Sequence, residues 1–303
     1  MDIIFAKNYA ISLGICYFLM SPVVAAPLHS YLIFFPDKQI HQSVYSLKEI
    51  RGVPKVNVQI QSGKKNIDAW LFENKQSDKI VLVSHGNAGN MAHRAVIADA
   101  LIEAGLSVLL YDYQGYGKSE GSPSVKNVCQ DGVAAYDYLL SKGYKPENII
   151  LYGESLGCSV ATNVSSQRKC AGLILQSGFS SLRNIAREKY LFFNAYPNFL
   201  FPKPNLDSLA VLENPHPPLL IMHGKEDRTI PYSHAEKMYA TAVGKKSMVL
   251  FEGTGHNDVF NTSRGQFMAA VKNFIGELPG SPHAVSYPEA VEQQRTTLFS
   301  AEH

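Results

Sequence analysis

The apolar residues of this chain fall into short blocks separated by turns, and the blocks have two different periodicities. Residues 56–61 and 67–72 nearly alternate apolar and polar side chains, and the glycine and two lysines at 63–65 mark a turn between them. This pattern predicts an antiparallel hairpin. The next block, 80–83, is apolar at every position, as is typical of a strand buried on both faces of a parallel sheet. We expect further strands of this kind at 106–111, 148–152, 173–175, 219–222 and 248–251.

Blocks with helical spacing lie between these strands. They predict helices over 91–104, 125–140, 156–166, 234–242 and 265–275. Strands that alternate with helices indicate βαβ units joined by right-handed crossovers. The sequence therefore predicts an α/β protein with a mostly parallel central sheet, helices on both faces, and a mixed edge formed by the hairpin.

One long segment interrupts this alternation. Residues 179–218 contain many aromatic residues and several prolines, and they are too numerous for a simple connection between two strands. We expect this cap segment to form a small cap over the functional site. The tail at 279–303 is polar, contains prolines and is expected to pack loosely. The main domain is then predicted to span 27–278.

The first part of the chain has a different character, because no Asp, Glu, Lys or Arg occurs from position 8 to position 36. An apolar run at 11–26 ends in small residues, which predicts a signal peptide cleaved after Ala25 and export to the periplasm or the medium. The run is shorter than the roughly 20 residues of a spanning helix, and Pro22 interrupts it. An uncleaved anchor over 1–26, which would attach the protein to a membrane, is the second interpretation. A buried N-terminal helix is the third.

Composition narrows the classes of function. The chain has 303 residues, of which 46% are hydrophobic and 18% charged, as in an ordinary globular protein. Its 28 Lys and Arg nearly balance its 26 Asp and Glu, so no nucleic-acid partner is expected. The four cysteines form no CxxC pair, and no metal-ligand spacing or nucleotide-binding glycine pattern occurs. We therefore expect neither a metal nor a cofactor.

The strongest chemical signal is the pentapeptide GESLG at 153–157. It lies between a predicted strand and a predicted helix, which is the context that a nucleophile elbow requires. A serine at the tip of such a turn has a strained backbone, and the crowded positions two before and two after it favour glycine. Ser155 is therefore the candidate nucleophile.

A serine hydroxyl needs a base, and the base needs a group that orients it. His256 lies in a glycine-bounded loop after the last predicted strand, and Asp227 follows the strand at 219–222. The order Ser155, Asp227, His256 is the one expected for a nucleophile elbow of this type. Asp207 is the reserve acid, and Asp258 is too close to the histidine in sequence. The competing histidines are His85, which could line the pocket, and His93, His223 and His234.

Attack by a serine on a carbonyl group creates a negatively charged oxygen, which needs two hydrogen-bond donors. One is expected to be the backbone N–H of Leu156, next to the candidate nucleophile. The other is expected from the loop HGNAGN at 85–90, which follows a strand, and we choose Asn87.

Several motifs together resemble one known superfamily. HGNAGN, DYQGYGKSEGSPS at 112–124, GESLG, HGKEDRTIP at 223–231 and GTGHND at 253–258 are similar in order and spacing to those of α/β-hydrolases. The resemblance covers about 53–277 and is strongest to the single-domain group that includes protein depalmitoylases and their bacterial relatives. It implies the α/β-hydrolase fold, with Ser155 as nucleophile, Asp227 as acid and His256 as base. The chain departs from this group at Cys158, where a second glycine is frequent, and it has only Cys16 in place of a cysteine-rich N-terminus.

The sequence thus predicts a serine hydrolase that cleaves a carboxylic ester or a thioester through an acyl-enzyme. Its partner would be a small-molecule or lipid acyl substrate, because the cap segment is rich in apolar residues. Two alternatives remain: an amide hydrolase similar to serine aminopeptidases, and a non-catalytic binding protein on the same fold.

Overall fold

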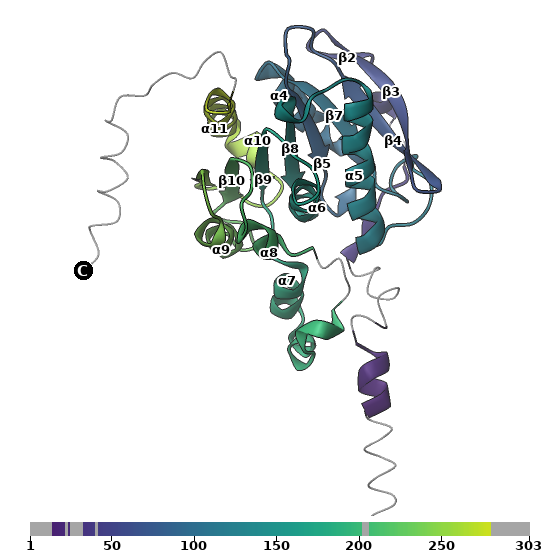
Figure 1. Ribbon diagram of the computed structural model, residues 1–303, viewed down its shortest axis with the longest axis vertical. Helices are drawn as coiled ribbons and strands as arrows, with labels where there is room; N and C mark the ends of the chain where they lie inside the picture. The colour runs from purple at the N-terminus through teal and green to yellow at the C-terminus, as the bar shows by residue number, and fades with distance from the viewer. Residues whose placement is uncertain (1–13, 22–23, 25–32, 40–41, 202–205, 280–303) are drawn as a thin grey trace, which may run out of the picture.

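A nine-stranded sheet forms the centre of the computed structural model, which describes residues 14–21, 24, 33–39, 42–201 and 206–279 (Figure 1). The strand order is β11-β10-β9-β8-β5-β7-β4-β3-β2. The six strands from β11 to β7 in this order are parallel, and β4, β3 and β2 continue the sheet as antiparallel strands. Their bounds are β2 Glu49–Ile50, β3 Val53–Ser62, β4 Lys65–Phe72, β5 Ile80–Ser84, β7 Ser107–Tyr111, β8 Ile149–Glu154, β9 Gly172–Gln176, β10 Leu219–Gly224 and β11 Lys246–Phe251.

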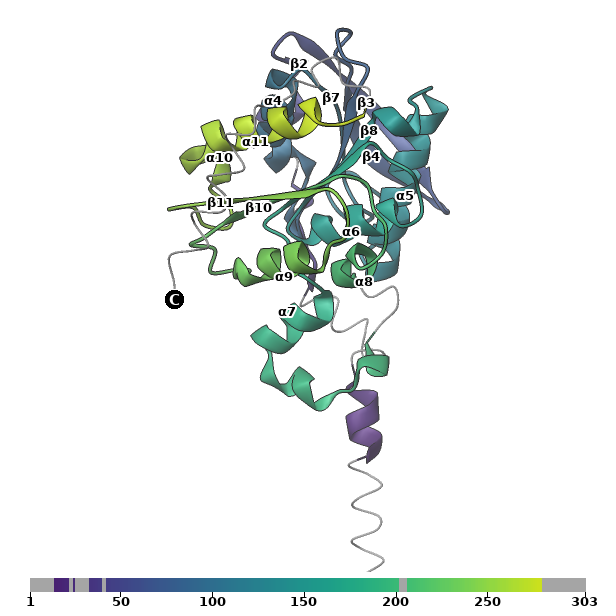
Figure 2. The same ribbon diagram turned by 60° about the vertical axis from the view of Figure 1, so that its left-hand side comes forward.

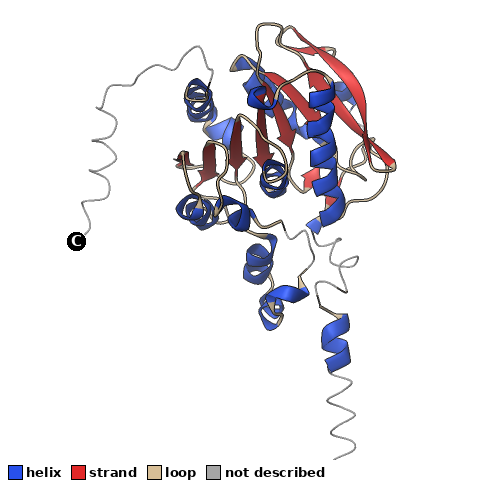
Figure 3. Ribbon diagram, viewed as in Figure 1, coloured by secondary structure: helices blue, strands red, loops and turns tan. Residues whose placement is uncertain are grey.

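Helices cover both faces of this sheet, as Figures 2 and 3 show. Alternate residues of each central strand point to opposite faces. Ile80 and Leu82 therefore belong to one apolar cluster, and Val81 and Val83 belong to another. The first cluster includes residues of α5 Val125–Ser141, α6 Leu156–Ser165, α8 Ser208–Leu212 and α9 Ser233–Thr241, and the second includes residues of α4 Ala95–Glu103, α10 Val259–Thr262 and α11 Arg264–Gly276. The predicted fold class is confirmed.

One predicted helix begins differently from expectation. Residues 91–104 were predicted as a single helix, but the first turn is the 3-10 helix η1 Met91–Arg94. The side chain of Asn90 accepts a hydrogen bond from the N–H of Ala92 at 3.1 Å and caps this turn. The α-helix α4 begins only after it.

The cap segment leaves the sheet at the carboxyl end of β9 and rejoins it at β10. It contains α7 Leu182–Lys189, η3 Leu191–Ala195, η4 Asn198–Leu200 and α8. Its aromatic residues divide into two groups, because Phe193, Tyr196 and Phe201 form a small buried cluster with Leu200, whereas Tyr190, Leu191, Phe192 and Phe199 are exposed. Composition alone could not distinguish these two groups.

Parts of the N-terminal stretch are also described. Residues 14–19 are helical, lie at one end of the molecule (Figures 1 and 2), and contact the end of η3 through Tyr17. The strand β1 Phe35–Pro36 pairs in parallel with β6 Ala88–Gly89. No helix in the described ranges combines the length and the apolar character needed to cross a membrane. The predicted cleavage position after Ala25 and the tail from 280 onward lie outside the described residues.

Candidate active site

Ser155 lies in the sharp turn between β8 and α6. Its backbone has φ +54° and ψ −117°, a left-handed conformation that is rare for a residue other than glycine. The Ser155 N–H donates to the carbonyl of Gln176 at 2.9 Å, which holds the turn against the end of β9. Such a strained serine at a strand-to-helix turn is typical of a functional site.

The glycines on either side of this turn are in tight contact with neighbouring backbone. A Cβ at Gly157 would overlap the carbonyl oxygen of Ser84, and a Cβ at Gly153 would overlap the backbone of residues 157 and 158. The close approach of α6 to β5 therefore depends on the absence of a side chain at Gly157, and its close approach to β8 depends on the same absence at Gly153.

Replacing Gly157 with alanine should lower the free energy of unfolding by about 1–3 kcal/mol, because the added methyl group overlaps backbone that cannot move aside. Urea unfolding of the variant measures this change. Gly265→Ala is the matched control, because a Cβ at Gly265 meets no atom within 4 Å and the position lies in helix α11. We expect this control to be neutral or slightly stabilising. Equal destabilisation by the two substitutions would contradict the role assigned to Gly157.

The structure brings the side chains of Ser155, His256 and Asp227 together. His256 Nε2 lies 3.1 Å from Ser155 Oγ, and His256 Nδ1 lies 2.6 Å from Asp227 Oδ2. The carboxylate can only accept, so His256 Nδ1 carries the proton and Nε2 is left to accept the proton of the hydroxyl. The three residues come from the loops that follow β8, β11 and β10, at the same edge of the sheet.

Asp227 is held by four hydrogen bonds. Oδ1 accepts from the N–H groups of Thr229 and Ile230, both at 2.8 Å. Oδ2 accepts from His256 and from Nε2 of His223, which lies 3.1 Å away. Burial alone would raise the pKa of the Asp227 carboxyl, but the hydrogen bonds from the two histidines outweigh it and hold this pKa well below the usual range. The acid therefore remains an anion.

His223 is a contact of this site that the sequence did not reveal. Its side chain is buried, and Nε2 faces two acceptors, the Asp227 carboxylate and the carbonyl of Ile230 at 2.8 Å. Nε2 must therefore carry the proton. The sequence identified His223 only as one of the histidines that compete with His256. The position of His223 four residues before Asp227, at the end of β10, was the signal for this contact.

The other candidates lie elsewhere. Asp207 caps α8 by accepting from the N–H of Ala210 at 3.2 Å and is 3.3 Å from Arg183, so the structure does not bring it to the histidine. His234 contacts Glu188 at 2.8 Å. His93 packs at the η1 cap beside Asn90.

Asn87 lies in a loop that passes directly beside Ser155. A Cβ at Gly86 would lie 3.3 Å from the Cβ of Ser155. The Gly86 carbonyl accepts from His85 Nδ1 at 2.7 Å, and the trans peptide then directs the Asn87 N–H to the opposite side. Among the described residues, neither this N–H nor that of Leu156 has a hydrogen-bond partner. Both predicted donors are therefore free to bind an oxygen.

The loop is further fixed by a partly buried ion pair next to the serine, whose two side chains are 13% and 14% exposed. Glu154 Oε2 accepts from Arg94 Nε at 2.7 Å and from the N–H of Gly86 at 3.1 Å. Arg94 Nη1 also donates to the carbonyl of Ala88 at 2.8 Å. Burial would raise the pKa of Glu154, but the Arg94 charge outweighs it and lowers this pKa. The pair therefore holds the residues on both sides of Asn87.

Replacing Glu154 with glutamine should lower kcat/KM for the ester substrates that the sequence predicts by about ten-fold, because even a small displacement of Asn87, the predicted oxyanion donor, is costly. It should also destabilise the fold, because Arg94 loses its counter-charge. Adding Arg94→Met should restore stability but not the rate, as steady-state kinetics and urea unfolding would show. The control is Glu147→Gln at an exposed position. An unchanged kcat/KM in Glu154→Gln would mean that the loop keeps its place without the pair.

Residues 33–36 also make hydrogen bonds to the loop that contains Asn87. The Asn87 carbonyl accepts from the N–H of Phe35 at 2.9 Å and from the hydroxyl of Tyr116 at 2.7 Å. The Asn87 side-chain amide donates to the carbonyl of Ile33 at 2.9 Å. A two-residue strand has too little sequence pattern to be predicted, so this support was not foreseen.

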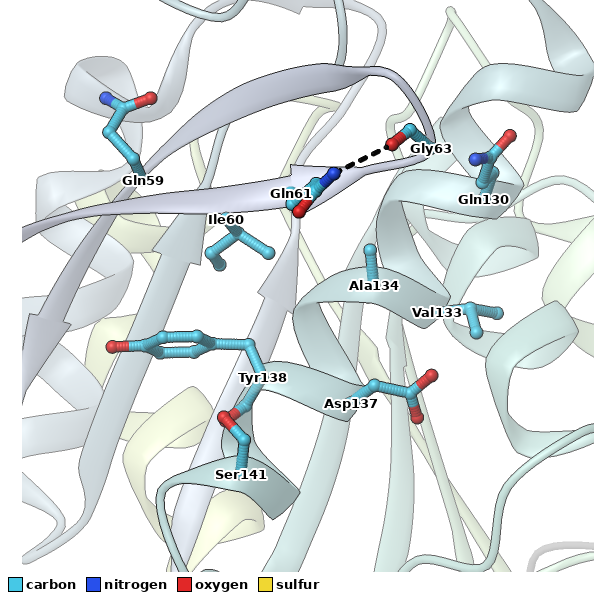
Figure 4. A pocket seen from close by; sticks show the side chains of 10 residues that line it. All are labelled: Gln59, Ile60, Gln61, Gly63, Gln130, Val133, Ala134, Asp137, Tyr138 and Ser141. Carbon is cyan, nitrogen blue, oxygen red and sulfur yellow. Dashed lines mark hydrogen bonds between the residues drawn. The ribbon is translucent and has the colours of Figure 1, made fainter.

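No group of three or more His, Cys, Asp or Glu side chains in the described ranges could hold a metal ion. A shallow cleft of about 410 Å³ lies between β3 and α5 (Figure 4). Its lining includes Gln59, Gln130 and Tyr138 but none of the candidate site residues. We do not assign it to the site.

Comparison with known proteins gives relatives for most of the chain. The family model described as "Serine aminopeptidase, S33" matches residues 75–215. An uncharacterized protein of Mycobacterium tuberculosis (strain H37Rv) is 34% identical over 249 residues, which cover 81% of this chain and 86% of the relative. The human alpha/beta hydrolase domain-containing protein 17C is 35% identical over 207 residues, which cover 66% of this chain but only 59% of that protein.

Solved structures share the fold at lower identity. An esterase of Pyrococcus furiosus is 20% identical with a TM-score of 0.64, covering 83% of this chain and 100% of its own. The enzyme Est1E of Butyrivibrio proteoclasticus, solved with ferulic acid, is 19% identical with a TM-score of 0.60, covering 73% of this chain and 98% of its own. These likenesses concern the fold.

Proposed function

Because the chain belongs to the α/β-hydrolase superfamily, we propose that it is a serine hydrolase that cleaves carboxylic ester or thioester bonds through an acyl-enzyme. One observation carries the proposal: the continuous hydrogen-bonded path from Ser155 Oγ through His256 to Asp227. A base oriented by a buried anion is what converts a serine hydroxyl into a nucleophile.

The geometry suggests a role for each residue in the reaction. Ser155 Oγ would attack the carbonyl carbon of the substrate while His256 Nε2 takes its proton. The resulting oxyanion would accept hydrogen bonds from the N–H groups of Asn87 and Leu156, at the positive end of helix α6. His256 would then protonate the leaving alcohol or thiol. A water molecule would release the acid by the same steps, with Asp227 ionised throughout.

An acyl substrate is supported by the position and composition of the cap segment. The chain enters this segment directly after Gln176, whose carbonyl accepts the Ser155 N–H at 2.9 Å. The segment therefore starts beside the nucleophile, and many of its side chains are apolar. An acyl chain that enters such surroundings gains about 0.8 kcal/mol per buried methylene.

We expect kcat/KM for p-nitrophenyl esters to rise several-fold with each added methylene until the pocket is full, because transition-state binding grows with buried area. Thioesters of matched chain length should follow the same trend. The measurement compares these substrates with aminoacyl-nitroanilides. A flat response to chain length together with faster aminoacyl cleavage would contradict an acyl preference.

Amide hydrolysis is the second candidate function. The match of residues 75–215 to the serine aminopeptidase family model is the observation that favours it. The comparison with aminoacyl-nitroanilides described above tests amide hydrolysis directly. A non-catalytic binding protein, by contrast, would fail to react with a fluorophosphonate at Ser155.

A further inference from the structure

The exposed apolar side chains of this protein are concentrated at one end. Ten of the sixteen large apolar residues that are exposed in the described part of the chain fall within 15–24 and 190–199. Leu191 is 81% exposed and Phe199 is 75% exposed, and Tyr190 and Phe192 lie with them on the cap segment. Single exposed apolar residues are ordinary, but a cluster of this kind marks an interaction surface.

The two segments that form this surface are in direct contact. The rings of Tyr17 and Tyr196 stack with their centroids 4.6 Å apart and 20° between their planes. The Tyr17 hydroxyl also donates to the carbonyl of Ala195. The helix at 14–19 therefore lies against the cap segment, and Figures 1 and 2 both place the two beyond the same end of the sheet.

The distribution of charged residues around this surface indicates which kind of partner it binds. Residues 190–201 contain no Asp, Glu, Lys or Arg, and neither does the stretch from 8 to 36. The adjoining helix α7 ends in Lys189, an exposed residue with no ion pair among the described residues. Arg187 lies behind the surface, where it donates to the carbonyl of Tyr196 at 2.6 Å. The neighbouring Glu188 pairs with His234 at 2.8 Å and with Lys237 at 3.5 Å, so Lys189 is the one basic residue at the edge without an acidic partner among the described residues. An uncharged surface of aromatic and aliphatic side chains with a basic residue at its edge has the chemistry of a bilayer-interface anchor.

We propose that the residues Tyr190, Leu191, Phe192 and Phe199 dock on the surface of an anionic lipid bilayer. In the chain that keeps its N-terminal segment uncleaved, the helix at 14–19 lies in the interface beside them. The described helix is too short to span a bilayer, so it adds apolar contact area in the plane of the surface. The lack of charged residues in the sequence ranges 8–36 and 190–201 favours a bilayer over a second protein as the partner. Docking goes beyond the reaction proposed above and does not depend on it.

Tryptophan fluorescence can test this proposal in the full-length chain. The only native tryptophan, Trp70, is 1% exposed and packs on Tyr45 inside the fold, so it serves as an internal reference. Phe199→Trp places a second tryptophan on the proposed surface. Val96→Trp is the matched control, because Val96 is exposed on α4 and does not belong to the proposed surface.

The probe is a vesicle of phosphatidylcholine and phosphatidylglycerol with brominated acyl chains, which quench tryptophan on contact. We expect at least about two-fold quenching of Trp emission in Phe199→Trp, with little change in Val96→Trp or in the unmodified chain. Equal quenching of the two variants would overturn the proposal, as would vesicle binding without quenching in Phe199→Trp. Dimerisation that shields position 199 would instead assign the surface to a second copy.

A second variant tests the energetic contribution of the surface. The double substitution Leu191→Ser and Phe199→Ser should weaken flotation with these vesicles by about ten-fold or more, because two large apolar side chains no longer enter the interface. Val56→Ser with Val96→Ser, both exposed residues elsewhere, is the control. Urea unfolding of each variant reports an intact fold separately from lipid binding. Unchanged flotation of a normally folded Leu191/Phe199 variant would refute docking by this surface.

Discussion

Ser155→Ala should abolish covalent labelling by a fluorophosphonate and lower kcat/KM for a p-nitrophenyl ester by about 10⁴-fold or more. The substitution removes the only hydroxyl that lies within hydrogen-bond distance of His256 Nε2, at 3.1 Å, among the described residues. The backbone donors at Asn87 and Leu156 would remain, so a low residual rate is expected. Gel-based labelling and steady-state kinetics measure the two effects.

A second serine provides the control for this experiment. Ser159 lies one turn further along α6, is buried, and contacts Ser208 Oγ at 3.1 Å rather than His256. Ser159→Ala should keep both labelling and turnover within a few-fold of the unmodified protein. Full labelling of Ser155→Ala would show that the nucleophile is another residue.

Asp227→Asn should lower kcat by about 10⁴-fold while preserving the fold, because an amide in this position favours the wrong histidine tautomer. The asparagine can donate to His256 Nδ1, which moves the imidazole proton to Nε2. The nitrogen 3.1 Å from Ser155 Oγ could then no longer accept the hydroxyl proton. Steady-state kinetics at neutral pH, together with urea unfolding, separates this loss from a loss of stability.

Asp207→Asn is the natural comparison, because the sequence alone offered Asp207 as the reserve acid. In the structure its carboxylate caps α8 and lies beside Arg183. An asparagine can still cap the helix and loses only the ion pair, so the substitution should cost about 0–1 kcal/mol of stability and leave kcat nearly unchanged. If Asp207→Asn is the damaging change and Asp227→Asn is mild, the acid has been assigned wrongly.

The fold was predictable because its central strands are buried on both faces. Strands β5, β7, β9 and β10 have every residue buried, and such uninterrupted apolar runs are visible in the sequence. The residues Ser155, Asp227 and His256 could be chosen because each follows a predicted strand. In a parallel sheet these positions meet at one edge.

The supporting contacts could not be predicted, because they join residues far apart in the sequence. Arg94 reaches Glu154 across 60 positions, and Phe35 reaches Asn87 across 52. Nothing in the local pattern of either residue identifies its partner. Burial within the cap segment could not be predicted either. Phe193 and Phe199 belong to the same aromatic run, but only Phe193 is buried.

The pairing of β1 with β6 has a practical consequence for preparing this protein. A chain shortened up to position 32 would keep the Ile33 carbonyl and the Phe35 N–H that hold Asn87. A chain that lacks residues 1–40 would retain every strand of the nine-stranded sheet. Its circular dichroism spectrum would therefore indicate a folded protein. The shortened chain would nevertheless lack both of these contacts, so a soluble and stable preparation could be inactive solely because of where its N-terminus was cut.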